Sequence, residues 1–546
     1  MVTFPEPMET HPQRLLLNGD EAIAWAARDN GFAMGVGYPG TPSTEILEAF
    51  GALGGHAQWS PNEKVALEVG LGAAFARARV LVTMKHVGLN VAADPLFTVA
   101  YTGVDGALVI VVADDPGMAS SQNEQDSRRY AVAAGVPMLE PADSQQAYDC
   151  LARAVEISER WQIPVLLRIT TRVSHSKTIV ARRSFAPPPA PGYERKISQR
   201  VMVPGHARPA HRRLREKLEA IRAWAEEDGN GTRLYAPLEG RDAGTRGIIA
   251  SGIGAVLARE AAPDTPVLQV FMAHPLPERA VRRFAAAHAK TYIVEEGDPV
   301  LWEGCVLAGA APVRNPPVYR FSEMSVTRVA RLLADETAPE TPPPPGKPPQ
   351  LCVGCPHRTA FEILRDRQAI VSGDIGCYTL GVMPPYQAMD TTVCMGASIS
   401  AGLGLRHVLP EAEARRVVSV IGDSTFMHSG LTGIAEMIYN PPPTGHVVLI
   451  LDNGTTAMTG MQEHPATGRD LLHGPANRIS IEATVKAMGV PNVVVLDHVA
   501  NPHALGETLD RAAREGGLWV IVARRPCILA AVKIKQYDAA NAGAKA

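Results

Sequence analysis

Short apolar runs of strand length recur along this chain and constrain its fold more than any other feature. Each run is rich in β-branched residues, ends near Gly, Asp or Thr, and is followed by a stretch with helical spacing. Examples are 79–86 (RVLVTMKH), 107–115 (ALVIVVADD), 163–171, 247–254 and 447–453. Strands that alternate with helices in this way predict an α/β fold built on parallel sheets.

Two interruptions divide the chain of 546 residues into blocks. The three predicted α/β domains span 1–190, 247–336 and 351–535. The charged segment 191–246 is expected to form a linker with an exposed helix, because it combines helical spacing with many Lys, Arg and Glu residues. The proline-rich stretch 337–350 predicts an extended linker, and 536–546 predicts a loose tail.

Charge and hydropathy exclude several classes of partner. Lys and Arg total 53 against 56 Asp and Glu, a formal net charge of −3, so no basic excess is available to hold a nucleic acid. The longest strongly apolar run, 107–113, is far shorter than the ~20 residues of a membrane span. The N-terminus shows no basic segment followed by an apolar stretch. We therefore expect a soluble, cytoplasmic protein that binds neither nucleic acid nor membrane.

Two of the predicted strands end in residues suited to a metal. Residues 417–424 read VVSVIGDS and residues 447–453 read VVLILDN, so Asp423 and Asn453 would leave the ends of two parallel strands. Carboxylate and amide oxygens suit a Mg²⁺ ion that also holds phosphate oxygens, and Gly422 allows a close turn of the backbone. Two ordinary strand ends would explain the same residues without a ligand.

A run of small residues follows Met395, beginning with Gly396 and Ala397. Such a helix start lets the backbone approach a cofactor closely. Close packing between helices would also account for it.

The cysteines are clustered rather than spread as in a disulfide framework. Of seven, four lie between Cys352 and Cys394, and Cys352 and Cys355 are separated by two residues. With Cys377 and Cys527 they could give four-fold thiolate coordination of zinc or of a 4Fe-4S cluster. Cys394 is a rival fourth ligand, and buried thiols without a ligand are a further interpretation.

Together these motifs resemble one family. The matching stretches are GYPGTPSTEI (37–46), NEKVALEVGLGAA (62–74), LVTMKHVGLNVAADPL (81–96), SSQNEQDSR (120–128), VEEGDP (294–299), CVGCPHR, GDIGCYTLG, CMGAS and RRPCIL. They resemble the alpha subunits of indolepyruvate ferredoxin oxidoreductases, within the thiamine-diphosphate-dependent 2-oxoacid ferredoxin oxidoreductases. The diphosphate motif of thiamine enzymes, GDG followed by NN, reads GDS and DN here.

The resemblance implies a fold and a set of cofactors. The three blocks would be a pyrimidine-binding domain, a transketolase C-terminal-like domain and a diphosphate-binding domain, assembled as a dimer. Thiamine diphosphate would lie at Gly422, Asp423, Ser424, Asn453, Thr455, Met395, Gly396 and Ala397. Asp423, Asn453 and the carbonyl of Thr455 would hold Mg²⁺. A 4Fe-4S cluster would be held by Cys352, Cys355, Cys377 and Cys527.

The resemblance also implies catalytic roles. Glu63 would hydrogen-bond the pyrimidine ring, with Glu68 as the competing candidate. Thr41 would contact the substrate, although the sequence around it also looks like a helix N-cap. Lys85 and His86 would line the substrate pocket, and Arg128 would pair with the substrate carboxylate.

The activity implied is oxidative decarboxylation of an aryl-2-oxoacid, such as indolepyruvate or phenylpyruvate, to the arylacetyl-CoA and CO2. Electrons would pass through the internal cluster to ferredoxin or another carrier, and a smaller beta subunit and coenzyme A would take part. The ferredoxin-like domain that usually follows RRPCIL in this family is not recognisable after Cys527. That departure keeps open a non-redox decarboxylase or carboligase with structural cysteines. A non-catalytic relative would need a ruined cofactor site, which the retained Asp423, Asn453 and Glu63 argue against.

Overall fold

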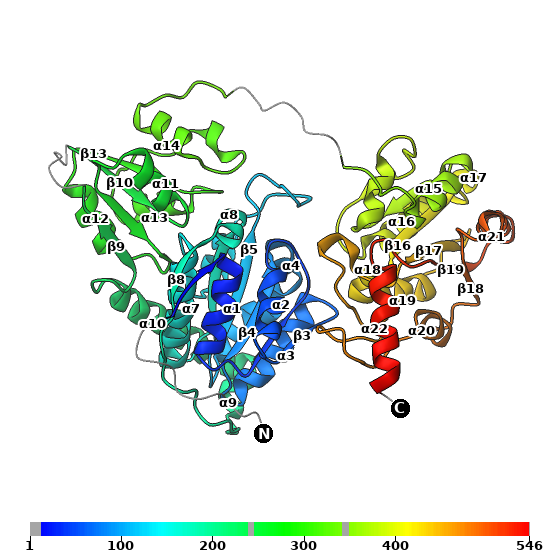
Figure 1. Ribbon diagram of the computed structural model, residues 1–546, viewed down its shortest axis with the longest axis horizontal. Helices are drawn as coiled ribbons and strands as arrows, with labels where there is room; N and C mark the ends of the chain where they lie inside the picture. The colour runs from blue at the N-terminus through cyan, green and yellow to red at the C-terminus, as the bar shows by residue number, and fades with distance from the viewer. Residues whose placement is uncertain (1–12, 238–244, 341–348, 545–546) are drawn as a thin grey trace. The chain divides into compact units, whose positions relative to one another are not determined.

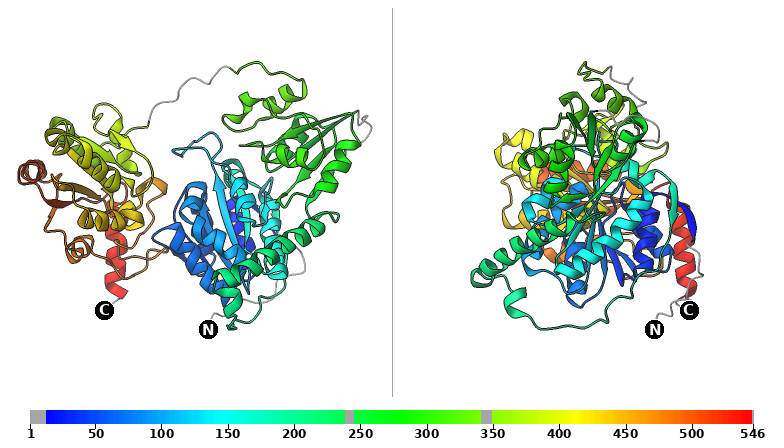
Figure 2. Two further views of the ribbon diagram at one scale, coloured as in Figure 1. Left: turned by 180° about the vertical axis from the view of Figure 1, so that it is seen from behind. Right: turned by 90° about the vertical axis from the view of Figure 1, so that its left-hand side faces the viewer.

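The computed structural model describes residues 13–237, 245–340 and 349–544 (Figure 1). The chain divides into two compact units, Met1–Pro342 and Pro343–Ala546. Both units are built on mostly parallel sheets flanked by helices, so the α/β prediction is confirmed (Figures 1 and 2). Within the described residues, no helix has the length and apolar character needed to cross a membrane.

The first unit contains a seven-stranded sheet in the order β12-β6-β7-β5-β4-β2-β3. All neighbours are parallel except β12 with β6. Its strands are β2 Met34–Gly37, β3 Ala57–Trp59, β4 Val80–Lys85, β5 Leu108–Asp114, β6 Met138–Leu139, β7 Val165–Thr170 and β12 Met272–His274. The central strands β4, β5 and β7 are buried along their whole length, as expected for a parallel sheet covered on both faces.

Eight helices lie between and beside these strands. They are α1 Gly19–Asp29, α2 Thr44–Ala52, α3 Glu63–Phe75, α4 His86–Val91, α5 Ala93–Thr102, α6 Arg128–Ala134, α7 Ser144–Trp161 and α8 Thr171–His175. A two-stranded antiparallel sheet, β1 Arg14–Leu17 with β8 Thr178–Ala181, joins the start of this block to its end.

A second sheet of the same unit has the order β13-β10-β11-β9. Its strands are β9 Thr232–Tyr235, β10 Arg246–Ala250, β11 Val267–Val270 and β13 Lys290–Val294. Its helices are α11 Gly254–Ala261, α12 Glu278–Ala286, α13 Val300–Leu307, η1 Pro317–Arg320 and α14 Val326–Leu333. The strand β9 falls in the segment expected to be a linker, so the second sheet begins earlier in the chain than 247.

The segment between the two sheets is also more ordered than the sequence suggested. It contains α9 Ile197–Arg200 and α10 Pro204–Ala225. The helix α10 was expected to be exposed, but it buries Leu214, Leu218 and Ile221 on one face. Its apolar spacing of three and four residues is therefore used for packing. Residues 238–244 lie outside the described residues.

The second unit is built on a six-stranded, fully parallel sheet in the order β15-β14-β16-β17-β19-β18. Its strands are β14 Ile370–Gly373, β15 Thr391–Thr392, β16 Val417–Gly422, β17 His446–Asp452, β18 Asn492–Leu496 and β19 Leu518–Arg524. Its helices are α15 Pro356–Asp366, η2 Cys377–Val382, α16 Ala397–Val408, α17 Glu411–Ala414, α18 Asp423–Thr425, η3 Phe426–Gly430, α19 Leu431–Tyr439, η4 Ala457–Thr459, α20 Ile481–Met488, α21 Pro502–Glu515 and α22 Ala531–Ala544.

The prediction of a loose tail at 536–546 is wrong for its described residues, because α22 continues through Ala544. Tyr537 stacks on His473 with ring centroids 4.1 Å apart, and Asp538 accepts a 2.8 Å hydrogen bond from Arg469. These contacts attach the helix to the second unit. Of the proline-rich linker at 337–350, residues 341–348 lie outside the described residues, as do 545–546.

A buried carboxyl group in the first unit gives a pH-dependent stability. Glu296 is almost fully buried, and burial raises its pKa from 4.5 to about 7, although the backbone N–H of Met324 donates a 2.9 Å hydrogen bond to it. Between these two pH values the unfolded chain releases a proton that the folded chain retains. The free energy of unfolding therefore falls as pH rises from about 4.5 to 7 on account of this group.

Glu296→Gln removes the ionisable group and keeps the carbonyl acceptor. We expect the variant to be more stable than the wild type at pH 8, by up to about 3 kcal/mol, and to show a smaller gain at pH 5. Thermal unfolding of the full chain at the two pH values measures this difference. The exposed α10 residue Glu216, changed to Gln, is the control, and an equal gain at both pH values for Glu296→Gln would contradict the account.

Candidate functional site

Asp423 and Asn453 leave the sheet of the second unit at the same edge. The strands β16 and β17 are adjacent and parallel, with Gly422 opposite Leu451. Asp423 begins α18 directly after β16, and Asn453 follows the last residue of β17. The expectation that the two residues lie at the ends of two parallel strands is confirmed, and the structure shows that these strands are neighbours. The carboxyl edge of a parallel sheet is where α/β proteins bind ligands.

The carboxylate of Asp423 is buried and held by donors. Its Oδ2 accepts a 2.8 Å hydrogen bond from the backbone N–H of Gly454 and lies 3.2 Å from Nε2 of His464. Burial alone would raise the pKa of Asp423, but His464 and backbone donors outweigh it and lower the pKa. Asp423 is therefore a buried, ionised carboxylate, the kind of donor that a hard cation requires. His464 could not be predicted from the sequence, because no spacing signal connects it to Asp423.

The loop after β17 places the remaining predicted residues around Asp423. The backbone N–H of Thr455 donates a 3.1 Å hydrogen bond to Oδ1 of Asn453. The hydroxyls of Ser424 and Thr456 lie 2.7 Å apart, which joins the start of α18 to this loop. Gly454 has a φ of +76°, a conformation that a residue with a side chain rarely adopts. The loop thus brings Asn453 and Thr455 to the strand end that carries Asp423.

Met395 and Gly396 lead into α16, which begins at Ala397 and whose start is held by a buried aspartate. The carboxylate of Asp374 accepts hydrogen bonds from the backbone N–H of Gly396 at 2.8 Å and of Ser398 at 3.0 Å. Gly396 has a φ of +87°, and a Cβ there would lie 2.5 Å from Cβ of Ser429. The close packing that the small residues indicated is therefore present. Asp374 lies in the GDIGCYTLG motif, but its role as a cap could not be read from that motif.

Four cysteines line one cavity of about 120 Å³ in the second unit. They are Cys352, Cys355, Cys377 and Cys527. Much of the remaining lining is apolar and includes Leu351, Leu380, Met461 and Leu529. Cys394 is exposed and absent from this lining. The structure thus gathers Cys527, rather than Cys394, with the other three thiols, and we name this cavity the thiol cavity.

The thiols of this cavity interact electrostatically. Burial, followed by the charges of the neighbouring cysteines, raises the pKa of Cys377 to about 11. The pKa of Cys355 is raised by burial, with Cys352 and Cys527 adding to it. The raised pKa values of Cys355 and Cys377 keep these two thiols protonated unless a positive charge stands beside them. A metal ion or metal cluster supplies that charge, so the donor set fits one.

The thiol cavity adjoins the edge that carries Asp423. Asn453 lines the cavity, and its backbone carbonyl accepts a 2.9 Å hydrogen bond from the N–H of Cys527. The buried imidazole of His357 also lines the cavity, and its Nε2 lies 3.4 Å from Nδ2 of Asn453. Burial lowers the pKa of His357 to about 4, so the ring is neutral at pH 7 and its Nε2 can accept from the amide. His357 thereby orients the Asn453 side chain, a role that the CVGCPHR motif did not reveal.

In the first unit, the two glutamate candidates occupy different environments. Glu63 is the first residue of α3 and is only 4% exposed. A Cβ on Gly88 would lie 2.5 Å from Oε1 of Glu63, so the glycine makes room for the carboxylate beside α4. Glu68 is exposed and forms an ion pair with Lys64 one helical turn away. The structure therefore separates a buried, enclosed Glu63 from a solvated Glu68.

Thr41 lies in the turn that precedes α2. In this turn the backbone N–H of Gly40 donates to Oγ1 of Thr44 at 3.0 Å, and the Ser43 hydroxyl donates to the carbonyl of Gly40 at 2.8 Å. The helix begins at Thr44, which puts Ser43 at the N-cap position, so the interpretation of Thr41 as the N-cap is wrong. A Cβ on Gly40 would lie 3.0 Å from Cβ of Lys85, which brings this turn against the end of β4.

Lys85 and His86 connect the end of β4 to the loop that follows β5. Nζ of Lys85 donates a 2.7 Å hydrogen bond to the carbonyl of Ser120, and Nε2 of His86 lies 3.2 Å from the carbonyl of Asn123. Burial lowers the pKa of Lys85 to about 8, against the attraction of Asp115. Burial also lowers the pKa of His86. The two side chains thus hold the loop 118–125 against the end of the strand.

The role expected for Arg128 does not fit the structure. Its side chain is 2% exposed, and the guanidinium donates to Asp126, to Glu295 at 2.8 Å, and to the backbone carbonyls of Glu296 and Asp298. These bonds occupy its donors. They also join α6, beside the seven-stranded sheet, to the segment that follows β13 of the four-stranded sheet. We therefore withdraw Arg128 as a ligand of the substrate carboxylate. A buried arginine that is already paired has no free face to offer an anion.

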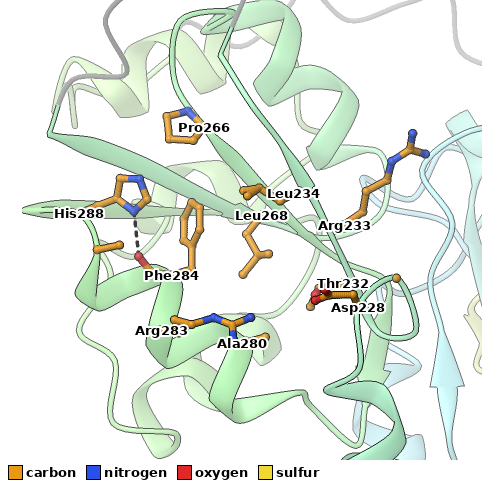
Figure 3. A pocket seen from close by; sticks show the side chains of 12 residues that line it. Asp228, Thr232, Arg233, Leu234, Pro266, Leu268, Ala280, Arg283, Phe284 and His288 are labelled. Atoms are coloured by element: carbon orange, nitrogen blue, oxygen red, sulfur yellow. Dashed lines mark hydrogen bonds between the residues drawn. The ribbon is translucent and has the colours of Figure 1, made fainter.

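A larger cavity, of about 660 Å³, lies beside β9, β11 and α12 in the first unit (Figure 3). Its polar lining includes Asp228, Arg233 and Arg283, while His288 is bonded to the carbonyl of Phe284 at 2.8 Å. None of the predicted site residues lines it. Size alone therefore does not mark the functional site here.

Comparison with known proteins assigns a class to this chain. Residues 26–202 match the family model described as pyruvate flavodoxin/ferredoxin oxidoreductase, thiamine diP-bdg. Residues 374–523 match the C-terminal TPP-binding domain of thiamine pyrophosphate enzymes. A solved 2-oxoglutarate:ferredoxin oxidoreductase from Magnetococcus marinus shares the fold, with a TM-score of 0.50 and 15% identity over 61% of this chain and 67% of that one. The chain is a thiamine-diphosphate-dependent 2-oxoacid oxidoreductase.

Curated relatives narrow this class. The indolepyruvate oxidoreductase subunit IorA of Methanothermobacter thermautotrophicus is 37% identical, over 97% of this chain and 90% of that protein. The protein of the same name from Pyrococcus abyssi is 38% identical, over 95% of this chain and 86% of that protein. This chain belongs to the family of indolepyruvate oxidoreductase subunit IorA.

The cap on α16 gives a prediction for the second unit. Asp374→Ala leaves the buried N–H groups of Gly396 and Ser398 without their acceptor, so we expect a loss of about 2–4 kcal/mol in the free energy of unfolding. Denaturant unfolding of the full chain measures it. Asp366→Ala, at an exposed position that pairs with Arg365, is the control. Equal stability of the two variants would show that Asp374 does not hold the helix start.

Proposed function

We propose that this chain is the catalytic subunit for oxidative decarboxylation of an aryl-2-oxoacid, of the indolepyruvate or phenylpyruvate type, to the arylacetyl-CoA and CO2. Electrons leave through a 4Fe-4S cluster in the thiol cavity to ferredoxin or another carrier. A smaller beta subunit and coenzyme A complete the system. The observation that carries the proposal is the position of Asn453, which lines the thiol cavity and follows the strand next to the one that Asp423 directly follows.

The residues around Asp423 fit a diphosphate held through Mg²⁺. The buried, ionised carboxylate of Asp423, the amide oxygen of Asn453 and the carbonyl of Thr455 are hard oxygen ligands of the kind Mg²⁺ prefers. Gly422, Ser424 and the segment 395–397 that leads into α16 supply the surrounding backbone. Thiamine diphosphate, when bound, supplies the nucleophilic carbon and the electron sink that decarboxylation of a 2-oxoacid needs.

The thiol cavity fits a 4Fe-4S cluster held by Cys352, Cys355, Cys377 and Cys527. Four thiols with a largely apolar surround are the donor set of such a cluster, and they also admit zinc. A redox role is favoured by the adjacency of the cavity to Asn453, because one-electron transfer needs a short path from the reacting centre. Structural zinc would instead favour a non-redox decarboxylase or carboligase.

The first unit supplies the groups for proton control and substrate binding. Glu63 would accept and return a proton at the pyrimidine ring, and its burial beside Gly88 shields that exchange from water. Thr41, Lys85 and His86 would border the substrate. The proposed assembly is a dimer of this chain.

Replacing the fourth cysteine tests the cluster assignment. We expect Cys527→Ser to lose most of its iron and acid-labile sulfide when purified without oxygen, because one of four ligands is missing. Cys394→Ser, at an exposed cysteine outside the cavity, should keep the wild-type content. Iron and sulfide assays give the answer. Loss in Cys394→Ser with retention in Cys527→Ser would reverse the assignment, and zinc in both would support the non-redox alternative.

Glu63→Gln tests the proton-transfer role. The amide keeps the shape of the side chain but cannot ionise, so we expect thiamine diphosphate binding to persist while kcat falls by at least about 100-fold. Activity with the aryl-2-oxoacid and cofactor content are measured together. Glu68→Gln is the matched control on the same helix and should retain activity. An unaffected rate in Glu63→Gln would move the assignment to Glu68.

A further inference from the structure

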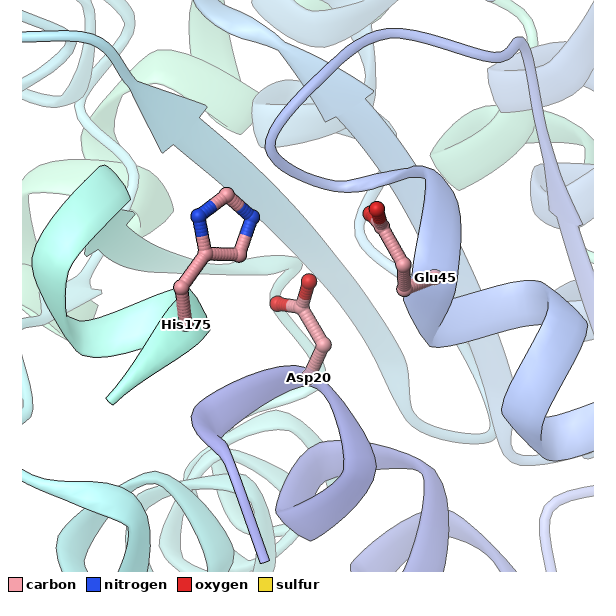
Figure 4. Close-up of side chains that lie close together, drawn as sticks. All are labelled: Asp20, Glu45 and His175. Atoms are coloured by element: carbon pink, nitrogen blue, oxygen red, sulfur yellow. The ribbon is translucent and has the colours of Figure 1, made fainter. Parts of the chain in front are cut away.

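Three side chains that commonly bind metals converge in the first unit, apart from the residues assigned above. They are Asp20 on α1, Glu45 on α2 and His175 at the end of α8 (Figure 4). Each offers one ligand atom, and these atoms all lie within 4.8 Å of one another. Figure 4 shows the Asp20 carboxylate between the imidazole of His175 and the carboxylate of Glu45. The three groups therefore face a common point from three helices.

Asp20 is buried without a hydrogen-bonding partner. Its side chain has 0% exposure, and neither carboxylate oxygen has a hydrogen-bond partner among the described residues. Oε2 of Glu45 is likewise unpaired. Burial, followed by the charge of Glu45, raises the pKa of Asp20 well above its ordinary value, and the nearby Ser174 hydroxyl offsets only part of this. A buried polar group without a partner costs free energy, which a bound cation would recover.

The surrounding backbone holds the three groups in place. A Cβ on Gly19 would lie 2.3 Å from the carbonyl oxygen of Val173, so the start of α1 touches the backbone of α8. Asn18 and Glu21 form reciprocal side-chain caps at the same end of α1. The position of Asp20 relative to α8 is thus fixed by contacts that do not depend on its own charge. Such a set of ligands is preformed rather than assembled on binding.

We propose that Asp20, Glu45 and His175 bind a divalent first-row metal ion. Two carboxylates and one imidazole suit ions such as Mn²⁺ and Zn²⁺, with water completing the coordination. Because Glu45 lies in the first turn of α2, the ion would link this turn to α1 and α8. It would thereby steady the segment that carries Thr41. This site is separate from the oxygen ligands at Asp423, and it does not depend on the proposed reaction.

Mn²⁺ alone is the appropriate probe, because thiolates select softer metals and thiamine diphosphate is left out. The free Mn²⁺ signal in electron paramagnetic resonance, followed through a titration of the full chain, gives stoichiometry and affinity. We expect Asp20→Asn and His175→Ala each to lower the affinity of one Mn²⁺ site by at least about 10-fold. Loss of a residue that only hydrogen-bonds a metal ligand already lowers affinity by about this factor, and these variants remove the ligands themselves. The Mn²⁺-dependent rise in thermal stability should disappear with it.

Two controls separate this site from other metal binding. His503→Ala, at an exposed histidine of the second unit, and Asp423→Ala should both retain the site. His175 is exposed, so its replacement tests the proposal even where Asp20→Asn does not fold. If the wild type and His175→Ala bind Mn²⁺ with equal stoichiometry and affinity, the proposal is wrong. Asp20 would then be a buried carboxyl group that keeps its proton.

Discussion

The parallel pairing of β16 with β17 is the constraint on which the site of the second unit depends. Parallel strands end at the same edge, so the strand pairing alone places Asp423 and Asn453 at neighbouring positions. A shift of one residue in this register would turn the alternate side chains of a buried strand to the opposite face. Both strands are buried along their whole length, so such a shift would lose the free energy gained by burying their apolar side chains.

Polar groups around this edge are positioned by other buried polar groups. Asp423 is held by Gly454 and His464, and Asn453 is oriented by His357. Removing the carboxylate of Asp423 or the imidazole of His357 would leave a buried polar partner unpaired. Substitutions in these networks therefore cost free energy of folding. His357 lines the thiol cavity as well, so the same side chain borders both parts of the site.

Much of the fold could be predicted because its signals are local. Strand-length apolar runs predicted the positions of β4, β5, β7 and β17 to within a residue or two, since burial on both faces leaves a continuous apolar pattern, and the run predicted for β10 extended four residues beyond its end. The strand β9 was not predicted, because it is short and borders a charged segment. The helix α22 was not predicted, because its alanine-rich sequence lacks a strong apolar face and contacts such as that of Tyr537 with His473 are long-range.

The site residues that could be predicted were likewise those with local sequence signals. Strand ends and cysteine spacing pointed to Asp423, Asn453 and the four thiols, whereas His464, His357 and the ion pairs of Arg128 depend on residues far apart in sequence.

In the proposed enzyme, one chain combines a thiamine diphosphate site with a redox cluster. The most direct test is the iron, acid-labile sulfide, zinc and thiamine diphosphate content of anaerobically purified protein, with an electron paramagnetic resonance spectrum after dithionite reduction. We predict about four irons and four sulfides per chain and a signal from a reduced cluster. Bound thiamine diphosphate accompanied by zinc, or by no metal at the cysteines, would contradict it.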